Sequence, residues 1–188
     1  PKTVFLEKYK ETFANARNLV SGIINSKKID KKVNDLHFVA TNIPRRFANM
    51  VYRFGVDTLA YLPEASKQFI APLPMAYDTS LHCYKEISNM AGGHGGENLP
   101  KSQAIKDATM AHFIHANMKE DTKFIHYHGS YHSKFYESIM WYLLQLNSSL
   151  AIQTIEVVEQ TDVSEFDKEL LGNADFFIVV DEDMTKTH

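Results

Sequence analysis

The stretch PKSQAIKDATMAHFIHANMKEDTKFIHYH, residues 100–128, carries the pattern that decides the fold class. Apolar residues recur at helical spacing over 101–118, and KFIHYH (123–128) has the composition and length of a strand. A helix followed directly by a strand indicates an α/β arrangement when the same order repeats along the chain. The order does repeat on both sides of this stretch.

The predicted elements alternate between helix and strand. Further helices are expected at 5–24, 43–55, 64–71, 80–90 and 135–147, and further strands at 36–41, 151–160 and 175–180. This alternation predicts an α/β fold with a mostly parallel sheet flanked by helices. Four strands are few for such a sheet, and the chain begins at Pro1 with an apolar helix that needs a core to cover. We therefore expect 1–188 to be one domain, the C-terminal portion of a longer one, with a sheet edge that an upstream segment or a second chain covers.

Composition and charge restrict the class of protein. The 188 residues are 44% hydrophobic and 23% charged, which suits one globular domain with a core of its own. A net charge of −3 gives no electrostatic reason to expect nucleic acid as a partner. The single cysteine, Cys83, excludes an intrachain disulfide and any CxxC motif. No apolar run has the length of a membrane-spanning helix.

Two arginines open the helix expected at 43–55. Arg45 and Arg46 follow Pro44 in TNIPRRF, directly after an expected strand. The N-terminus of a helix is positive, so cations there are unfavourable unless an anion binds beside them. A bound carboxylate or phosphate group is one interpretation, and arginines that face solvent or pair with nearby acids are an equally good one.

The segment HYHGSYHS (126–133) concentrates histidine and tyrosine at another expected strand end. His126 and His128 share one face of the strand, because side chains alternate, and His132 follows the turn at Gly129. Such a group has the chemistry to ligate a metal or a haem iron, or to move protons. The alternative is a set of hydrogen-bonded polar side chains near a sheet edge.

The glycine-rich loop AGGHGG (91–96) presents His94 just before the long helix. Projection at 100° per residue places Gln103 and Asp107 within or beside the apolar face of that helix, and Thr109 opposite. A carboxylate turned toward the core needs a partner. We therefore expect Asp107 to be buried and hydrogen-bonded to His132, His94 or a backbone amide. Its pKa should be lowered by those bonds unless desolvation outweighs them.

Four segments of the chain resemble the ChaN-like haem-binding uptake proteins. They are ATNIPRR (40–46), APLP (71–74), GGHGGENLPKSQAIKDATMAHFI (92–114) and HYHGSYHS (126–133). The similarity runs over 36–160, and QAIKDATMA (103–111) is its most specific part. The Gly-Glu-x-His motif with which the family begins does not occur in this chain.

The resemblance implies an α/β fold related to the Tiki and erythromycin-esterase-like proteins. It also implies a lipoprotein or periplasmic protein of the bacterial cell envelope that serves haem and iron uptake. Membrane attachment would come only from a lipid anchor upstream of this chain. Haem would be the partner, bound non-covalently since no CxxCH motif occurs, with a tyrosine on the iron and a homodimer formed around paired haems.

Eight residues are candidates for that haem site. They are Arg45 and Arg46 near a propionate, Tyr52 and Tyr84 near the iron, His94 and His132 as further haem-binding residues, and Gln103 and Asp107 as residues that orient them.

Two alternatives to haem binding stay open. The same superfamily contains metal-dependent hydrolases, in which His94, Asp107 and His132 would activate water. Neither GxSxG nor HExxH occurs in the chain, so a binding function is preferred over an enzymatic one. A binding or scaffold module without any chemistry is the third interpretation.

Overall fold

The structure is a computed structural model that describes residues 7–8, 10–12, 43–90, 96–119 and 123–184. The chain divides into two compact units, Pro1–Ala40 and Thr41–His188. In the first unit residues 7–8 are helical, and the rest of the helix expected at 5–24 and the strand expected at 36–41 lie outside the described residues. The fold described below is that of the second unit.

The second unit contains the helices that the apolar spacing predicts. The α-helices are α3 (Arg45–Phe54), α4 (Glu64–Lys67), α5 (His82–Met90), α6 (Asn98–Asn117) and α7 (Ile139–Leu146). Short 3₁₀ helices lie at η2 (Val56–Tyr61), η3 (Ser130–His132), η4 (Lys134–Tyr136) and η5 (Lys168–Leu170). The predicted helices at 43–55, 64–71, 80–90 and 101–118 are confirmed, with ends that shift by a few residues.

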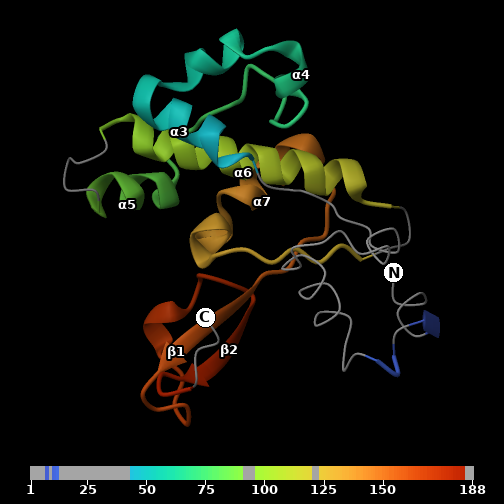
Figure 1. The fold of residues 1–188 in the computed structure, drawn as a ribbon. Coiled ribbons are helices and arrows are strands. Elements are labelled where there is room, and N and C mark those ends of the chain that lie inside the picture. The colour runs from blue at the N-terminus through green and yellow to red at the C-terminus, as the bar shows by residue number, and fades with distance from the viewer. Residues whose placement is uncertain (1–6, 9, 13–42, 91–95, 120–122, 185–188) are drawn as a thin grey trace. The chain divides into compact units, whose positions relative to one another are not determined.

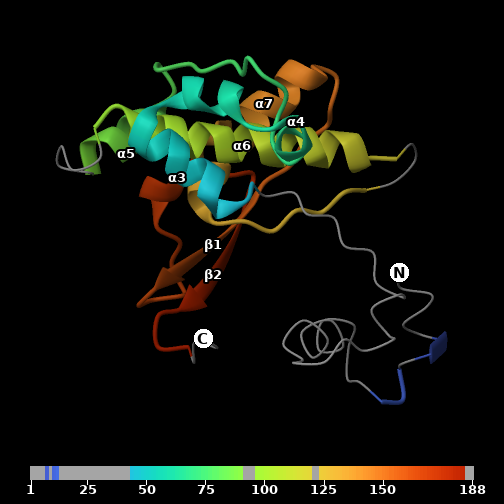
Figure 2. The ribbon, with the colours of Figure 1, turned by 45° about the horizontal axis from the view of Figure 1, so that its top comes forward.

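Helix α6 is the centre of the helical part. Helices α3, α5 and α7 each pack against it, and α3 and α5 lie on different sides of it (Figure 1; a second view is Figure 2). Ile105 joins the cluster of α3 and η2, Ala104 joins that of α5, and Ala111 joins that of α7. Thr109 is therefore fully buried, and its hydroxyl accepts a hydrogen bond from the backbone N–H of Ala71 at 3.1 Å. The prediction that Thr109 lies on an outer face was wrong, because partners cover α6 on more than one side.

The packing of α3 on α6 shows to which side of α6 Gln103 and Asp107 point. Residues two apart on a helix point about 160° away from each other. Ile105 packs on α3, so Gln103 and Asp107 point to the opposite side of α6. That side is covered by α5, whose Tyr84 belongs to a separate buried cluster.

Two parallel strands follow the helices. β1 (Ile155–Gln160) pairs with β2 (Phe176–Asp181) in the register Ile155↔Phe176 to Gln160↔Asp181. These strands confirm the predictions at 151–160 and 175–180. Together with the helices they make the fold α/β, and the sheet formed by the described residues has two strands. Ile155, Val157, Phe176 and Ile178 are exposed along one face of this pair.

The strand predicted at 123–128 does not form. These residues are assigned to neither helix nor sheet, and the apolar side chains of Ile125 and Tyr127 are 73% and 90% exposed. A strand needs a neighbour to accept its backbone hydrogen bonds and a core to bury one face, and the described residues supply neither here. The prediction was wrong because the sequence pattern carries no information about such a neighbour.

Helix α7 begins later than predicted, at Ile139 rather than near 135. The φ angles of Phe135, Tyr136 and Ser138 are 61°, 61° and 55°. These values lie in the left-handed region, which a right-handed helix does not contain, so α7 cannot include these residues. The apolar spacing of 135–147 therefore predicted the helix correctly but not the turn before it. Among the described residues, no helix is both long enough and apolar enough to cross a bilayer.

Candidate functional site

A buried carboxylate on α6 joins two other elements of the fold. The side chain of Asp107 is fully buried. Its Oδ2 accepts a hydrogen bond from the phenol of Tyr84 at 3.0 Å, and its Oδ1 lies 2.5 Å from Nδ1 of His132. The prediction that Asp107 is buried is confirmed, and of the three partners considered for it the structure shows His132. We call Tyr84, Asp107 and His132 the buried triad.

Tyr84 is held inside the core by this bond. It is fully buried on α5, and burial together with the charge of Asp107 raises the pKa of its phenol far above the ordinary value. The phenol therefore stays protonated and donates to Asp107. To ligate an iron, which binds a tyrosine through its oxygen, Tyr84 would have to give up this bond.

His132 is the member of the triad that reaches the surface. It ends η3, and its side chain is 19% exposed. The amide nitrogen of Gln103 lies 2.9 Å from its Nδ1, and Nζ of Lys106 donates to the amide oxygen of Gln103 at 3.4 Å. Gln103 and Asp107 lie one turn apart on α6, so both side chains meet the same imidazole, as the helical projection predicts.

Burial decides the direction in which the pKa of Asp107 moves. Burial raises it, and the hydrogen bonds from His132 and Tyr84 oppose that rise without reversing it. Of the two opposing effects expected for this carboxyl group, desolvation therefore outweighs the hydrogen bonds. The charged form of Asp107 therefore depends on the two donors of the triad.

The turn that follows His132 contains strained backbone and is bonded to the start of α5. Ser138 has φ 55° and ψ −114°, and its hydroxyl, which carries one proton, lies within hydrogen-bond distance of the carbonyl oxygen of Tyr131 (3.1 Å) and of Sγ of Cys83 (3.0 Å). The two carboxylate oxygens of Glu137 accept from the backbone N–H groups of His82 and Cys83 at 2.9 and 2.7 Å. Strain of this kind persists only where surrounding contacts hold it, and it is common at functional sites.

Glu137 and Ser138 were missed by the sequence reasoning. Ser138 directly before an apolar helical run has the position of a helix cap, which is a local signal. The contact of Glu137 with α5 joins residues more than 50 positions apart, and no local pattern indicates it.

A second pair of imidazoles lies just before this turn. Nδ1 of His126 lies 3.0 Å from Nδ1 of His128, and the two rings are stacked with centroids 5.0 Å apart. Burial and the neighbouring histidines lower the pKa of both, that of His128 to about 4. Within the described part of the chain, no three His, Cys, Asp or Glu side chains are grouped so that they hold a metal ion.

A comparison with models of protein families shows which family the chain belongs to. A family model for haem-binding uptake proteins of the Tiki superfamily, ChaN, matches residues 9–143. The chain belongs to this ChaN family. The matched region contains the whole buried triad, whereas β1 and β2 lie beyond it. No curated protein and no solved structure matches the chain.

The other candidates for the haem site of this ChaN-family chain lie elsewhere. Arg45 and Arg46 are exposed at the start of α3, with the guanidinium of Arg46 4.7 Å from the ring centroid of Phe47. Tyr52, on the same helix, is 39% exposed. Because α3 covers the Ile105 side of α6, these three residues are not brought together with His132. His94 lies outside the described residues.

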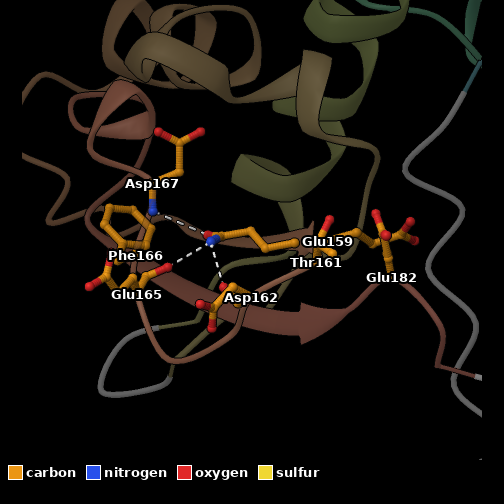
Figure 3. A pocket seen from close by; sticks show the side chains of 8 residues that line it. Glu159, Thr161, Asp162, Glu165, Phe166, Asp167 and Glu182 are labelled. Carbon is orange, nitrogen blue, oxygen red and sulfur yellow. Dashed lines mark hydrogen bonds between the residues drawn. The ribbon is translucent and has the colours of Figure 1, made fainter.

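One hollow of 480 Å³ opens beside the sheet of this ChaN-family chain, and its lining is acidic (Figure 3). Its charged residues are Glu159, Asp162, Glu165, Asp167 and Glu182. Gln160 closes one side, where its amide nitrogen donates to the carbonyls of Asp162 and Glu165 at 3.1 and 2.8 Å. Five carboxylates repel an anionic ligand, so this hollow does not suit the propionates of haem.

Proposed function

We propose that this ChaN-family protein binds haem non-covalently and that His132 ligates the iron. The observation that carries the proposal is the contact between Nδ1 of His132 and the buried carboxylate of Asp107. Histidines that ligate metals regularly donate their second ring N–H to a carboxylate, which fixes the tautomer and makes the other nitrogen more basic. With the proton on Nδ1, the Nε2 of His132 is the nitrogen that offers a lone pair, and an iron would displace the amide nitrogen of Gln103, which lies 3.4 Å from it.

The neighbouring side chains fit the needs of a haem. Tyr131 and Tyr136 expose aromatic surface on the turn that carries His132, and Nζ of Lys134 lies 5.9 Å from the ring of Tyr131. Lys106 adds a second cation near the imidazole. Aromatic surface for the ring and cations for the propionates are what a haem site requires besides an axial ligand. Haem itself supplies a redox-active iron whose properties depend on that ligand.

The buried triad gives each residue a separate task. His132 ligates, Asp107 holds its tautomer and orientation, and Tyr84 holds Asp107 in place. Gln103 borders the imidazole from the preceding turn of α6.

A titration with ferric haem tests the proposal. The wild-type protein should give a Soret band that saturates at one haem per chain. His132→Ala should weaken binding about tenfold or more, because the iron loses its axial ligand. His112→Ala is the matched control, since His112 lies on α6 and contacts only the ring of Phe113 among the rings of the described residues. Wild-type affinity in His132→Ala would overturn the assignment of the ligand.

We further propose that the protein acts in haem uptake at the bacterial cell envelope, attached through a lipid anchor upstream of this chain. Support comes from the family alone. Cells that lack the protein should grow poorly with haem as their iron source, and the His132→Ala gene should fail to restore growth where the wild-type gene succeeds. Equal restoration by both genes would contradict the proposal.

We propose a homodimer in which Arg45 and Arg46 of one copy reach the haem that is bound by the other copy. Arg45 and Arg46 are exposed at the start of α3, which packs on the Ile105 side of α6, and a second copy would bring them to the propionates of a haem on His132. Bidentate contacts from arginine to carboxylate would then favour the dimer with haem over the dimer without it.

A metal-dependent hydrolase is the second candidate, and the same histidine–aspartate pair favours it. An imidazole held by a carboxylate also serves as a general base toward water. Hydrolysis of simple esters and peptides in the presence of zinc or manganese distinguishes the two functions. Turnover that is lost in His132→Ala, in a protein without haem affinity, would favour the hydrolase.

A further inference from the structure

The pair His126 and His128 is a separate cluster that the haem site does not use. Their Nδ1 atoms face each other at 3.0 Å, and their rings are inclined by only 25°. Residue 127 lies between them, so both side chains project to one side of an extended segment. His132 uses its own Nδ1 toward Asp107, and its ring stands 6.1 Å from that of His128.

Two neutral imidazoles in this arrangement share one Nδ1 proton: one Nδ1–H donates, the other Nδ1 accepts, and the accepting ring carries its own proton on Nε2. If the donating ring gives its Nδ1 proton to water and takes one up on Nε2, both Nδ1 atoms present lone pairs. A divalent cation is then bound by both nitrogens with no net release of protons.

We propose that His126 and His128 chelate one divalent transition-metal ion through their Nδ1 atoms. Metal–imidazole bonds are about 2.0–2.1 Å long, so nitrogens 3.0 Å apart subtend roughly 91–97° at the metal. That angle matches the right angle between adjacent ligands in tetragonal complexes and falls short of the tetrahedral angle. Tetragonal nitrogen and oxygen sites select copper(II) and nickel(II), and copper(II) binds most tightly in the general series.

The pair supplies two protein ligands. Among the described residues, no third His, Cys, Asp or Glu joins it in a group that could hold a metal ion. Two protein ligands on an exposed segment give a weaker, exchangeable site than the closed sets that hold structural metals. The cation is therefore one that the protein exchanges with its surroundings rather than one that it needs to fold.

Titration of the untagged, haem-free chain with copper(II) tests the proposal. Calorimetry should show one ion per chain, and the electron paramagnetic resonance spectrum should show coupling to two imidazole nitrogens. His126→Ala and His128→Ala should each weaken binding about tenfold or more, because each removes one of two protein ligands. Circular dichroism verifies that both variants keep their helices.

Two control variants separate this site from the proposed haem site. His132→Ala and His112→Ala should bind copper(II) as the wild type does, while His132→Ala alone loses haem. Absence of binding by the wild type would overturn the proposal, as would wild-type affinity in His128→Ala. A loss of copper(II) in His132→Ala equal to that in His128→Ala would also overturn it, because the ion would then belong to the triad.

Discussion

Asp107 is the residue on which the rest of the site depends. Its carboxyl group is fully buried on the central helix, where its charge is unfavourable, and two donors from other elements offset that cost. The balance still leaves its pKa raised, with burial as the largest cause. This residue therefore combines a stability cost with the task of holding His132.

The raised pKa predicts how stability depends on pH. The folded state binds the Asp107 proton more tightly than the unfolded chain, whose ordinary pKa is 3.8. The contribution of Asp107 is thus fully present below that value and is lost as pH rises through the folded-state pKa. Asp107→Asn keeps the shape and does not titrate. The free energy of unfolding of the wild type, minus that of the variant, should fall with rising pH by at most about 1.4 kcal/mol per unit.

Urea unfolding of the two proteins at a series of pH values measures this difference. Titrating groups distant from Asp107 contribute equally to both proteins and cancel, whereas His132 contacts Asp107 and its titration is coupled to the substitution. A difference that instead grows in favour of the wild type as pH rises would show that the hydrogen bonds outweigh burial.

At the scale of elements, the turn of residues 130–138 links three parts of the second unit. Glu137 caps the first N–H groups of α5, Ser138 holds the carbonyl of Tyr131, and the backbone N–H of Phe135 donates to the carbonyl of Asn173 at 3.1 Å. These bonds offset the strain of positive φ angles at three of the four consecutive positions 135–138. The turn that follows His132 is therefore bonded both to α5 and to the segment before β2.

Glu137 should contribute to stability through this cap. Glu137→Ala leaves two helix-terminal N–H groups without their acceptor and should cost about 1–2 kcal/mol. Glu137→Gln keeps one acceptor oxygen but loses the charge at the N-terminus of α5, so it should cost less, roughly 0.3–1 kcal/mol. Thermal and urea unfolding measure both losses, with the exposed Glu165→Ala as control. An unchanged free energy of unfolding in Glu137→Ala would contradict the cap.

Local periodicity was sufficient to predict most of the elements. Apolar spacing located α3, α5 and α6, and runs of β-branched and aromatic residues located β1 and β2. It failed at 123–128. These residues have the composition of a strand but pair with no other strand among the described residues. It also failed at the start of α7, where contacts of Glu137 and Ser138 with distant residues decide the backbone.

The sequence also predicted part of the candidate site, namely the contacts that follow from the geometry of one helix. One helical projection placed Gln103 and Asp107 on a common side. The search for a partner of a buried carboxylate left His132, His94 and a backbone amide open, and the structure shows His132. The bond from Tyr84 to Asp107 was not predicted, because it depends on how α5 packs on α6. Pairs between elements follow from tertiary packing, which a single sequence does not reveal.

At the scale of the whole molecule, the proposed haem site has two halves on different sides of α6. Replacing both Arg45 and Arg46 by alanine should weaken haem binding and haem-dependent dimerisation together, while the exposed positions leave the fold unchanged. Light scattering after size-exclusion chromatography, with and without haem, measures the dimer. Unchanged haem affinity in the double variant would remove the arginines from the site.

The identity of the axial ligand is the most direct test of the account. His132→Gly removes the imidazole and leaves space where it stood, so free imidazole added to the solution can take its place beside Asp107. The ferric haem titration should show lost affinity in His132→Gly and recovery when imidazole is added, with the Soret band of the wild-type complex. Haem binding by His132→Gly that equals that of the wild type without imidazole would contradict the account, because the iron would then have another ligand.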